Sequence, residues 1–385
     1  MTVHENYYEE ALDEHLVKLL PIGLRIEKVK AFGITKPRLI GDIGLRAYFQ
    51  LYKKAKQLIR DGKIDFLYIT IPSFYGALLG RWLNKITGVK YGIDYIDPWV
   101  HRFPGSEKFF SRHWFSTQIA LFLEPIAVKK ASLITGVAAG YYKGVIERNP
   151  HLLRTAVFGA MPYGADARDH LMIDTLGLKP YLFEKKKDKM QLVYAGAMLP
   201  KAYDVLEKIF NAIQDDLISF DNVEFHFIGT GKLANDPLSF NIKPIAEKYN
   251  LWQTVVFEYP KRIPYLDVLI HLKSADALFI LGSTEPHYTP SKIYQGLLSG
   301  KPILAVLHKQ STAIKVLEDS NAGVILPFDG EAGLNSVRNQ FVPVFKRFFD
   351  FVKDFNPAQI SHQSFERYSA KQVTGQLADL LKKIV

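Results

Sequence analysis

The sequence predicts an α/β protein with two tandem doubly wound domains that face each other across a cleft. Its 385 residues exceed one core of ordinary size, so two domains are expected. Short apolar runs typical of buried strands alternate with segments of helical periodicity in both halves. A turn-rich pentapeptide, Pro-Tyr-Gly-Ala-Asp at residues 162–166, separates the two halves.

The first half is expected to form a parallel sheet with helices on both faces, because strand and helix patterns alternate along it. Strands are expected at residues 24–31, 64–70, 88–95, 132–137 and 155–161. Helices are expected at residues 42–60, 74–83, 121–130 and 140–148. Ser73 is expected to cap the second of these helices.

The second half repeats this alternation after a charged connector at residues 184–189. Its strands are expected at residues 191–194, 223–228, 255–257, 277–280, 303–306 and 323–326. Its helices are expected at residues 203–213, 264–272, 292–298 and 312–318. Helical patterns resume at residues 337–355 and 365–384.

Composition narrows the class of protein. The 48% hydrophobic and 23% charged residues are typical of a globular chain, and no apolar run reaches the roughly 18 to 20 residues of a spanning helix. The first 15 residues are acidic and polar, unlike a signal peptide. The absence of cysteine excludes disulfides and thiol nucleophiles, and it fits a cytosolic protein.

Positive charge is concentrated in the first half. Residues 1–166 carry 23 Lys and Arg against 15 Asp and Glu, within a net charge of +10 for the whole chain. Such an excess favours anionic partners, namely a membrane surface, a phosphorylated ligand or nucleic acid. The alternative is a solvated basic face that keeps the protein soluble.

The strongest candidate for a ligand site is the segment 281–306. It follows a buried strand, crosses a polar loop that contains Glu285, and continues into the helix expected at 292–298. Pro290 and Ser291 are expected to supply a turn and a polar cap for this helix. Parallel sheets bind ligands at the carboxyl ends of their strands, and a helix start favours phosphate. The carboxylate of Glu285 can accept hydrogen bonds from two sugar hydroxyls. The alternative is that Glu285 is a solvated loop acid.

Glycine-containing loops follow the first two strands of the second half. Gly196 comes before Lys201 and a helix start, which together suit a diphosphate. Gly229 and Gly231 permit a tight turn that lines the cleft. These loops match neither a dinucleotide fingerprint nor a Walker A loop, and turns without a ligand remain the alternative.

Asp97 is the acidic candidate of the first half. It follows the strand at 88–95, beside Asp94, where it is expected to project into the cleft from the opposite wall. An acid there can orient or deprotonate an acceptor hydroxyl. The alternative is an aspartate that caps the Asp-Pro turn.

The segment 99–115 interleaves aromatic and basic side chains, with Arg102, Lys108 and Arg112 among six aromatic residues. This pattern suits a membrane interface or a lipid-phosphate acceptor. Single-stranded nucleic acid and packing into the core of the same domain are the alternatives.

No metal site is expected, because the 11 histidines are scattered without an HExxH or Asp-x-Asp arrangement. The Gly-x-Ser-x-Gly elbow of many hydrolases does not occur in the sequence either.

With these residues placed, the chain resembles glycosyltransferases of the GT-B fold, and it is similar to the family 4 retaining nucleotide-sugar enzymes that build bacterial surface glycans. The resemblance is carried by the segments DYIDPW, MPYGAD, VYAGAMLPKAYDVL, HFIGTGKL and PSKIYQGLLSGKPILAV. It implies Rossmann-like domains at 1–166 on the acceptor side and at 167–364 on the nucleotide-sugar side. A C-terminal helix at 365–385 would return to the first domain.

The resemblance also implies residue roles. Lys201 would contact the donor diphosphate, Glu285 the hydroxyls of the donor sugar, and Asp97 would face the reacting carbon. Gln295 stands where the family has a ribose-binding glutamate, and Ala197 stands where it commonly has an arginine.

The implied function is transfer of a sugar from a nucleotide-sugar donor to a glycan or lipid-linked acceptor, with retention and with neither a metal nor a cofactor. The catalytic residues would be Asp97 and Glu285. The donor would be bound by Gly196, Lys201, Gly229, Gly231, Ser291, Lys292 and Gln295.

Two alternatives are a nucleotide-sugar epimerase of the same fold and a non-catalytic binding or scaffold protein. Nucleic acid is not expected as a partner, whereas an anionic membrane surface is expected through the basic first domain. The expected location is the cytoplasm, at the inner face of the cytoplasmic membrane.

The family normally opens with a strand and a glycine-rich loop, and the polar start Thr2-Val3-His4-Glu5 resembles neither. The first domain is therefore expected to lack its N-terminal strand, about 30 to 40 residues of the full fold by the usual strand, loop and helix lengths.

Overall fold

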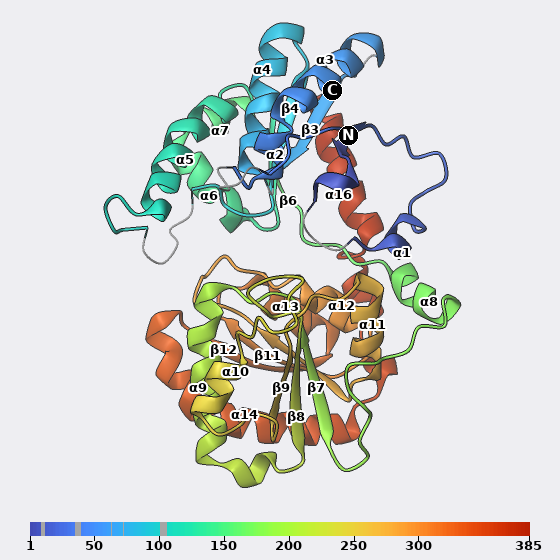
Figure 1. Cartoon of the computed structure of the whole chain (residues 1–385), viewed down its shortest axis with the longest axis vertical. Helices are drawn as coiled ribbons and strands as arrows, with labels where there is room; N and C mark the ends of the chain where they lie inside the picture. Colours follow the sequence, from blue (N-terminus) through green and yellow to red (C-terminus); the bar gives the residue numbers. More distant parts are fainter. Residues whose placement is uncertain (9–11, 35–39, 63, 72, 101–105) are drawn as a thin grey trace. The chain divides into compact units, whose positions relative to one another are not determined.

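The structure, a computed structural model, describes residues 1–8, 12–34, 40–62, 64–71, 73–100 and 106–385. The chain divides into two compact units (Figure 1). Unit 1 comprises Met1–Glu9, Pro21–Pro162 and Val373–Val385, and unit 2 comprises Glu10–Leu20 and Tyr163–Gln372. Each unit has its own sheet, and each is described separately.

Unit 1 contains a four-stranded parallel sheet in the order β3-β4-β5-β6. Its strands are β3 (Phe66–Thr70), β4 (Lys90–Tyr95), β5 (Leu133–Gly136) and β6 (Val157–Ala160). A separate parallel pair joins β1 (Thr2–Val3) to β2 (Lys28–Val29). The helices are α2 (Ile43–Arg46), α3 (Tyr48–Gly62), α4 (Ala77–Thr87), α5 (Arg112–Val128), α6 (Ala139–Arg148) and α7 (Leu152–Thr155).

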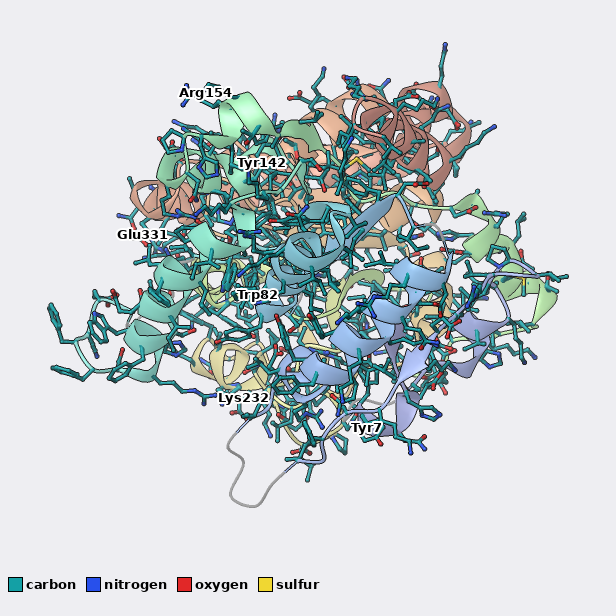
Figure 2. The ribbon with its side chains drawn as sticks, turned by 90° about the horizontal axis from the view of Figure 1, so that it is seen from above. Tyr7, Trp82, Tyr142, Arg154, Lys232 and Glu331 are labelled. Atoms are coloured by element: carbon teal, nitrogen blue, oxygen red, sulfur yellow. The ribbon has the colours of Figure 1, made fainter. Side chains whose placement is uncertain are left out.

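The core of unit 1 is built around β4, where Tyr91, Ile93 and Tyr95 are fully buried. Tyr142 of α6, labelled in Figure 2, packs on Phe158 of β6 with 6.0 Å between ring centroids. These contacts bury β4 and β5, whereas every residue of β3 remains at least partly exposed. Unit 1 therefore covers its sheet incompletely.

The end of the chain packs on β6 through α16 (Ala370–Lys382). A Cβ atom on Gly159 would lie 2.3 Å from Cδ1 of Leu380, so any larger residue there would require the Leu380 side chain to move. Lys90, at the start of β4, donates to the carbonyl of Ile384.

One buried ion pair ties helix α5 to α6. Glu124 has no exposed surface, and its carboxylate accepts from Nε and Nη2 of Arg148 at 2.8 and 2.9 Å. Asn149 Nδ2 adds a third hydrogen bond at 3.3 Å. The bidentate geometry compensates for the desolvation of the carboxylate.

Unit 2 contains a six-stranded parallel sheet in the order β12-β11-β10-β7-β8-β9. Its strands are β7 (Met190–Ala195), β8 (Val223–Ile228), β9 (Val256–Tyr259), β10 (Ala277–Leu281), β11 (Ile303–His308) and β12 (Gly323–Phe328). From β7 the chain continues to β8 on one side, and β10 lies on the other side. The β7–β10 pair is therefore the topological switch point, where such sheets bind ligands.

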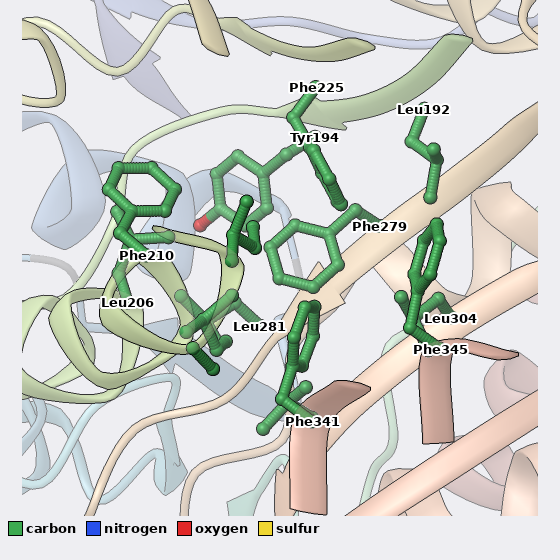
Figure 3. Packing of buried hydrophobic residues seen from close by; sticks show 14 of the residues in the cluster. Leu192, Tyr194, Leu206, Phe210, Phe225, Phe279, Leu281, Leu304, Phe341 and Phe345 are labelled. Carbon is green, nitrogen blue, oxygen red and sulfur yellow. The ribbon is translucent and has the colours of Figure 1, made fainter. Parts of the chain in front are cut away.

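Helices cover both faces of this sheet. They are α1 (Glu14–Val17), α8 (Ala167–Thr175), α9 (Tyr203–Asp215), α10 (Lys243–Lys248), α11 (Tyr265–Ser274), α12 (Lys292–Leu298), α13 (Thr312–Ser320), α14 (Leu334–Asp354) and α15 (His362–Glu366). Successive strand residues face opposite sides, as in β10, where Phe279 packs with α9 and α14 while Leu278 and Ile280 pack with α11, α12 and α13. Figure 3 shows the first of these two clusters, with Phe279 beside Phe225.

The α/β prediction and the two parallel sheets are confirmed. The helix expected at 292–298 has those bounds in α12, and the six strands of unit 2 lie where apolar runs predicted them. The local sequence was sufficient to predict these strands, because strands of a parallel sheet that are buried on both faces are apolar throughout.

Several boundaries were wrong. The strand expected at 24–31 is only Lys28–Val29, and the helix expected at 42–60 is broken into α2 and α3 at Ala47. The helix expected at 121–130 already begins at Arg112, because Ser111 Oγ accepts from the backbone N–H of Trp114 and caps it. Ser73 makes no capping bond and donates instead to Asp42 Oδ1 at 2.6 Å. The helix expected at 365–384 is divided into α15 and α16.

Candidate functional site

Two glycine turns meet at the carboxyl edge of the sheet of unit 2. Gly196 follows β7 with φ of +98°, and Gly229 follows β8 with φ of +70°, a region that favours glycine. Their N–H groups continue the ladders to Ile228 at 2.7 Å and to Tyr259 at 2.8 Å. A Cβ atom on Gly229 would lie 3.9 Å from Cα of Gly196, so the two predicted turns are neighbours.

Gly231 closes the second turn. Its N–H donates to the carbonyl of Pro260 at 3.0 Å, and a Cβ atom there would lie 2.8 Å from both that carbonyl oxygen and Cβ of Pro260. Any larger residue would push the loop after β9 away. The role of Gly231 in the structure is therefore to hold these loops together.

Lys292, the first residue of α12, lies against the Gly196 turn. Its Nζ donates to the carbonyl of Ala197 at 3.1 Å and lies 4.9 Å from the ring centroid of Tyr194. Its Cε would be 3.2 Å from a Cβ atom on Gly196. Burial lowers the pKa of Lys292 to about 8, so the group still carries a positive charge at neutral pH. The structure thus brings the predicted residues Gly196 and Lys292 together.

Ser291 does not cap α12, contrary to the sequence prediction. Its backbone is already helical, with φ of −59° and ψ of −23°, and its hydroxyl makes no capping hydrogen bond. A capping residue needs an extended backbone to aim its side chain at the N–H groups of the first turn. Ser291 remains exposed and lines a cavity together with Lys292.

Glu285 and Lys201 lie on adjoining loops at the ends of β10 and β7. The backbone N–H of Thr284 donates to the carbonyl of Lys201 at 3.4 Å. Glu285 is 8% exposed, and its carboxylate accepts from Ser283 Oγ at 3.4 Å. The alternative of a solvated loop acid is therefore wrong. Lys201 Nζ lies 3.9 Å from Glu331 Oε1.

Gln295 is held by residues that the sequence analysis did not single out. Its Oε1 accepts from His170 Nε2 at 2.9 Å, and its Nε2 donates to the hydroxyl of Tyr265. Tyr265 in turn donates to Asp169 Oδ2 at 2.8 Å. Burial lowers the pKa of His170, which keeps its ring neutral. His170 and Asp169 lie on α8, a helix that was not predicted, and no local signal links them to Gln295.

A cavity of about 290 Å³ lies beside these groups, between β7, β10, α11 and α12. Its walls are mainly apolar, with Val193, Leu278 and Val268 among them. Lys292 and Gln295 supply polar groups at this cavity. An apolar cavity with a few fixed polar groups is typical of a small-molecule site.

Asp97 belongs to unit 1, where it is exposed in the bend after β4. Asp94 lies within β4 and accepts from Thr135 Oγ1 at 2.7 Å. Burial raises the pKa of Asp94, and Thr135 also bonds the hydroxyl of Tyr68 at 2.7 Å. The neighbouring aspartates therefore differ, since Asp94 is fixed in the sheet and Asp97 faces solvent.

The aromatic side chains of the segment 99–115 separate into two groups. Trp99 is buried and stacks on Phe74 with 6.1 Å between centroids, so it belongs to the core of unit 1. Phe109 and Phe110 are exposed. Arg102 and Phe103 lie outside the described residues.

Comparison with known proteins identifies the fold. No family profile matches the chain, and no curated protein matches it in sequence. Among solved structures, HepE of Anabaena in complex with UDP-glucose is similar over 96% of this chain and 89% of its own, with a TM-score of 0.61 and 13% identity. The chain has the GT-B fold.

Two further GT-B likenesses support this. A UDP-forming α,α-trehalose-phosphate synthase from Burkholderia xenovorans is 11% identical, with a TM-score of 0.61 over 90% of this chain and 80% of its own. A glycosyltransferase from Rickettsia africae is 12% identical, with a TM-score of 0.53 over 87% of this chain and 80% of its own.

Two features are absent from the described part of the chain. None of the helices there combines the length and apolar character that crossing a membrane requires. Within the same residues, no three His, Cys, Asp or Glu side chains are grouped so that they could hold a metal ion.

Proposed function

We propose that this protein is a glycosyltransferase that moves a sugar from a nucleotide-sugar donor to a hydroxyl of a glycan or lipid-linked acceptor. The observation that carries the proposal is the Lys292 cation held against the Gly196 turn at the switch point of a GT-B-fold sheet. This arrangement suits the diphosphate of a donor. The UDP-glucose complex of HepE and the UDP-forming synthase, which share the fold, support a nucleotide-sugar donor.

In the proposed complex, the diphosphate lies near Gly196, Lys201 and Lys292. These groups stabilise the negative charge that develops on the leaving diphosphate as the glycosidic bond breaks. Because lysines supply this charge compensation, we propose that the reaction needs neither a metal nor a cofactor. Retention of the anomeric configuration is proposed from the resemblance to the family 4 enzymes. Glu285 accepts hydrogen bonds from the hydroxyls of the donor sugar.

Gln295 is proposed to contact the ribose. Its amide oxygen is engaged by His170 and one amide hydrogen by Tyr265, so the second N–H is the group that faces a ligand. Residues 1–166 are proposed as the acceptor side, with Asp97 as the group that orients the acceptor hydroxyl. Residues 167–364 would bind the donor, and 365–385 would return to the first domain.

The donor site is tested by thermal shift with a panel of nucleotides and nucleotide sugars. At saturating concentration the correct donor is expected to raise the melting temperature by about 2 to 5 °C. Lys201→Ala and Lys292→Met should weaken donor affinity about tenfold to a hundredfold, because each removes a charged contact to phosphate. Lys353→Met, which alters an exposed side chain of α14, is the matched control.

Stabilisation by no nucleotide would contradict the proposal and favour a scaffold protein. Glu285→Gln separates sugar recognition from nucleotide binding. It should weaken the binding of the nucleotide sugar but leave the binding of the free nucleoside diphosphate unchanged. Incubation with donor alone distinguishes the enzymes, because an epimerase brings the donor to equilibrium with its epimer whereas a transferase needs an acceptor.

A further inference from the structure

Helix α5 of unit 1 presents an apolar stripe to solvent. Phe115, Ile119 and Phe122 follow one another at i, i+4 and i+7, so they lie on one face, and all three are exposed. Phe122 is 71% exposed, which is unusual for a phenylalanine in a helix. The turn before the helix adds Phe109 and Phe110, which are 78% and 76% exposed.

Charge is absent from this face and present at both ends of the helix. Between residues 114 and 128 the single charged residue is Glu124, and it is fully buried in its pair with Arg148. Four exposed basic residues frame the stretch, namely Lys108, Arg112, Lys129 and Lys130. The face of α5 that carries Phe115, Ile119 and Phe122 is therefore uncharged along its length, and basic residues exceed the one exposed acid, Glu107, at its ends.

The local structure fixes these aromatic side chains. Ser111 caps α5 by accepting from the N–H of Trp114 at 3.0 Å. The ring of Trp114 lies 5.6 Å from that of Phe110 and 5.0 Å from that of Phe115. Phe110 has φ of +59°, a conformation that phenylalanine rarely adopts and that persists only when its surroundings impose it.

The position of α5 leaves this face accessible within its unit. In Figure 1 the helix lies at the outer edge of unit 1, and the turn before it extends away from the other helices of that unit. Side chains of this segment project outward from the ribbon in Figure 2.

We propose that α5 and the preceding turn dock unit 1 on an anionic lipid bilayer, with the helix in the plane of the interface. Phenylalanine and tryptophan side chains favour the boundary between headgroups and acyl chains, and lysine and arginine favour anionic headgroups. The cationic ends of this otherwise uncharged face complement the anionic headgroups on either side of an inserted helix. This inference concerns the location of the protein and does not depend on the donor chemistry.

The test is flotation of the full chain with vesicles of phosphatidylcholine, with and without phosphatidylglycerol. The protein is expected to float with the anionic vesicles and to bind them less as salt increases. The double variant Phe109→Ser, Phe122→Ser should lower the partition coefficient about tenfold or more, because it removes two rings that would insert into the bilayer. Both side chains are exposed, so folding should be unaffected.

The control is Leu238→Ser with Ile218→Ser in unit 2, whose side chains are 78% and 85% exposed. It should bind vesicles as the unaltered protein does. A second variant, Lys129→Glu with Lys130→Glu, should weaken binding to anionic vesicles. Its weak binding to neutral vesicles should be unchanged.

Three results would overturn the proposal. The first is no flotation of the unaltered protein, and the second is equal loss in the phenylalanine variant and the control. The third is that the phenylalanine variant changes the sedimentation coefficient of the protein without changing vesicle binding, which would assign this face to a second copy of the chain. Sugar transfer to a water-soluble acceptor should be equal in all variants. A failure of the membrane proposal can therefore be distinguished from a failure of the proposed glycosyltransferase function.

Discussion

The two units cover their parallel sheets to different degrees. In unit 2 both faces of the sheet are buried, and Phe210, Phe225, Phe279 and Phe345 lie fully inside one cluster. In unit 1 the strand β3 is partly exposed, and α5 turns an apolar stripe outward. Loops that hold a ligand at the edge of a sheet require a rigid, well-packed sheet beneath them. An exposed apolar face, by contrast, is typical of a surface that binds a partner. The difference is what the two proposals lead us to expect, namely that unit 2 holds a ligand and unit 1 binds a surface.

The largest expected effect comes from the core of unit 2. Phe225→Ala should lower the free energy of unfolding by about 3 to 5 kcal/mol, because it leaves a cavity between the sheet and α14. Phe122→Ala in unit 1 should change it by less than about 0.5 kcal/mol, since that ring is already in water. Urea unfolding of both variants measures the contrast. Similar losses at the two positions would show that Phe122 is buried in solution.

The second effect concerns the ion pair of unit 1. Arg148→Met should destabilise the protein by about 2 to 3 kcal/mol, because Glu124 stays buried with Asn149 as its remaining side-chain donor. Hydrogen exchange of α5 and α6 should rise, while exchange of β7 and β10 should not. Lys382→Met, which removes an exposed pair with Asp379, is the control and should cost less than about 1 kcal/mol. Equal exchange in both variants would show that the Glu124 pair does not hold α5.

The same contrast explains what the sequence predicted. Strands of unit 2 are apolar on both faces, so each was visible as a short apolar run without knowledge of its neighbours. The Gly196 turn and Lys292 were also predicted, because a glycine after a strand and a lysine at a helix start are local signals.

Contacts between distant segments were not predicted. Gln295 is held by His170, 125 residues earlier, and Ser73 bonds Asp42 instead of capping its own helix. The start of α5 was predictable, since Ser111 is an ordinary cap, but the helix was expected to begin only at residue 121 because aromatic and basic residues alternate irregularly before it. Partners of polar side chains thus depend on packing that periodicity does not encode.

The third effect is sensitivity of unit 2 to acid through His226. This ring is buried, stacks on Phe183 at 4.0 Å and bonds Glu224, which also pairs with Lys186. Burial lowers the pKa of His226 to about 4, below its usual 6.5. Between these values the unfolded chain binds a proton that the folded protein does not, so stability falls as pH decreases from 6.5 towards 4.

At pH 5 this loss should be about 2 kcal/mol relative to pH 7. Urea unfolding of His226→Gln should show a smaller difference between the two pH values than the unaltered protein does. His113→Gln on the exposed surface of α5 should leave the difference unchanged. If both variants retain the full difference in stability between pH 5 and pH 7, acid acts at other groups. The two units would then not differ in their sensitivity to acid.

The smallest expected effect has the opposite sign and concerns Lys292. Its pKa of about 8 lies below the usual 10.5, so the folded protein binds fewer protons than the unfolded chain between these values, and stability rises with pH through that range. Below pH 8 the desolvated charge of the partly exposed Lys292 side chain therefore destabilises the fold, and Lys292→Met should raise the free energy of unfolding at pH 7 by about 1 kcal/mol. The gain should be smaller at pH 9.5, where urea unfolding is repeated, and Lys353→Met should show no gain at either pH. A loss of stability in Lys292→Met at pH 7 would mean that its contacts with Ala197 and the ring of Tyr194 outweigh the desolvation of the charge. If Lys292→Met gains stability and loses nucleotide binding, unit 2 keeps a destabilising cation because its ligand requires it. Unit 1 would then match it with a different unfavourable feature, the exposed apolar face of α5.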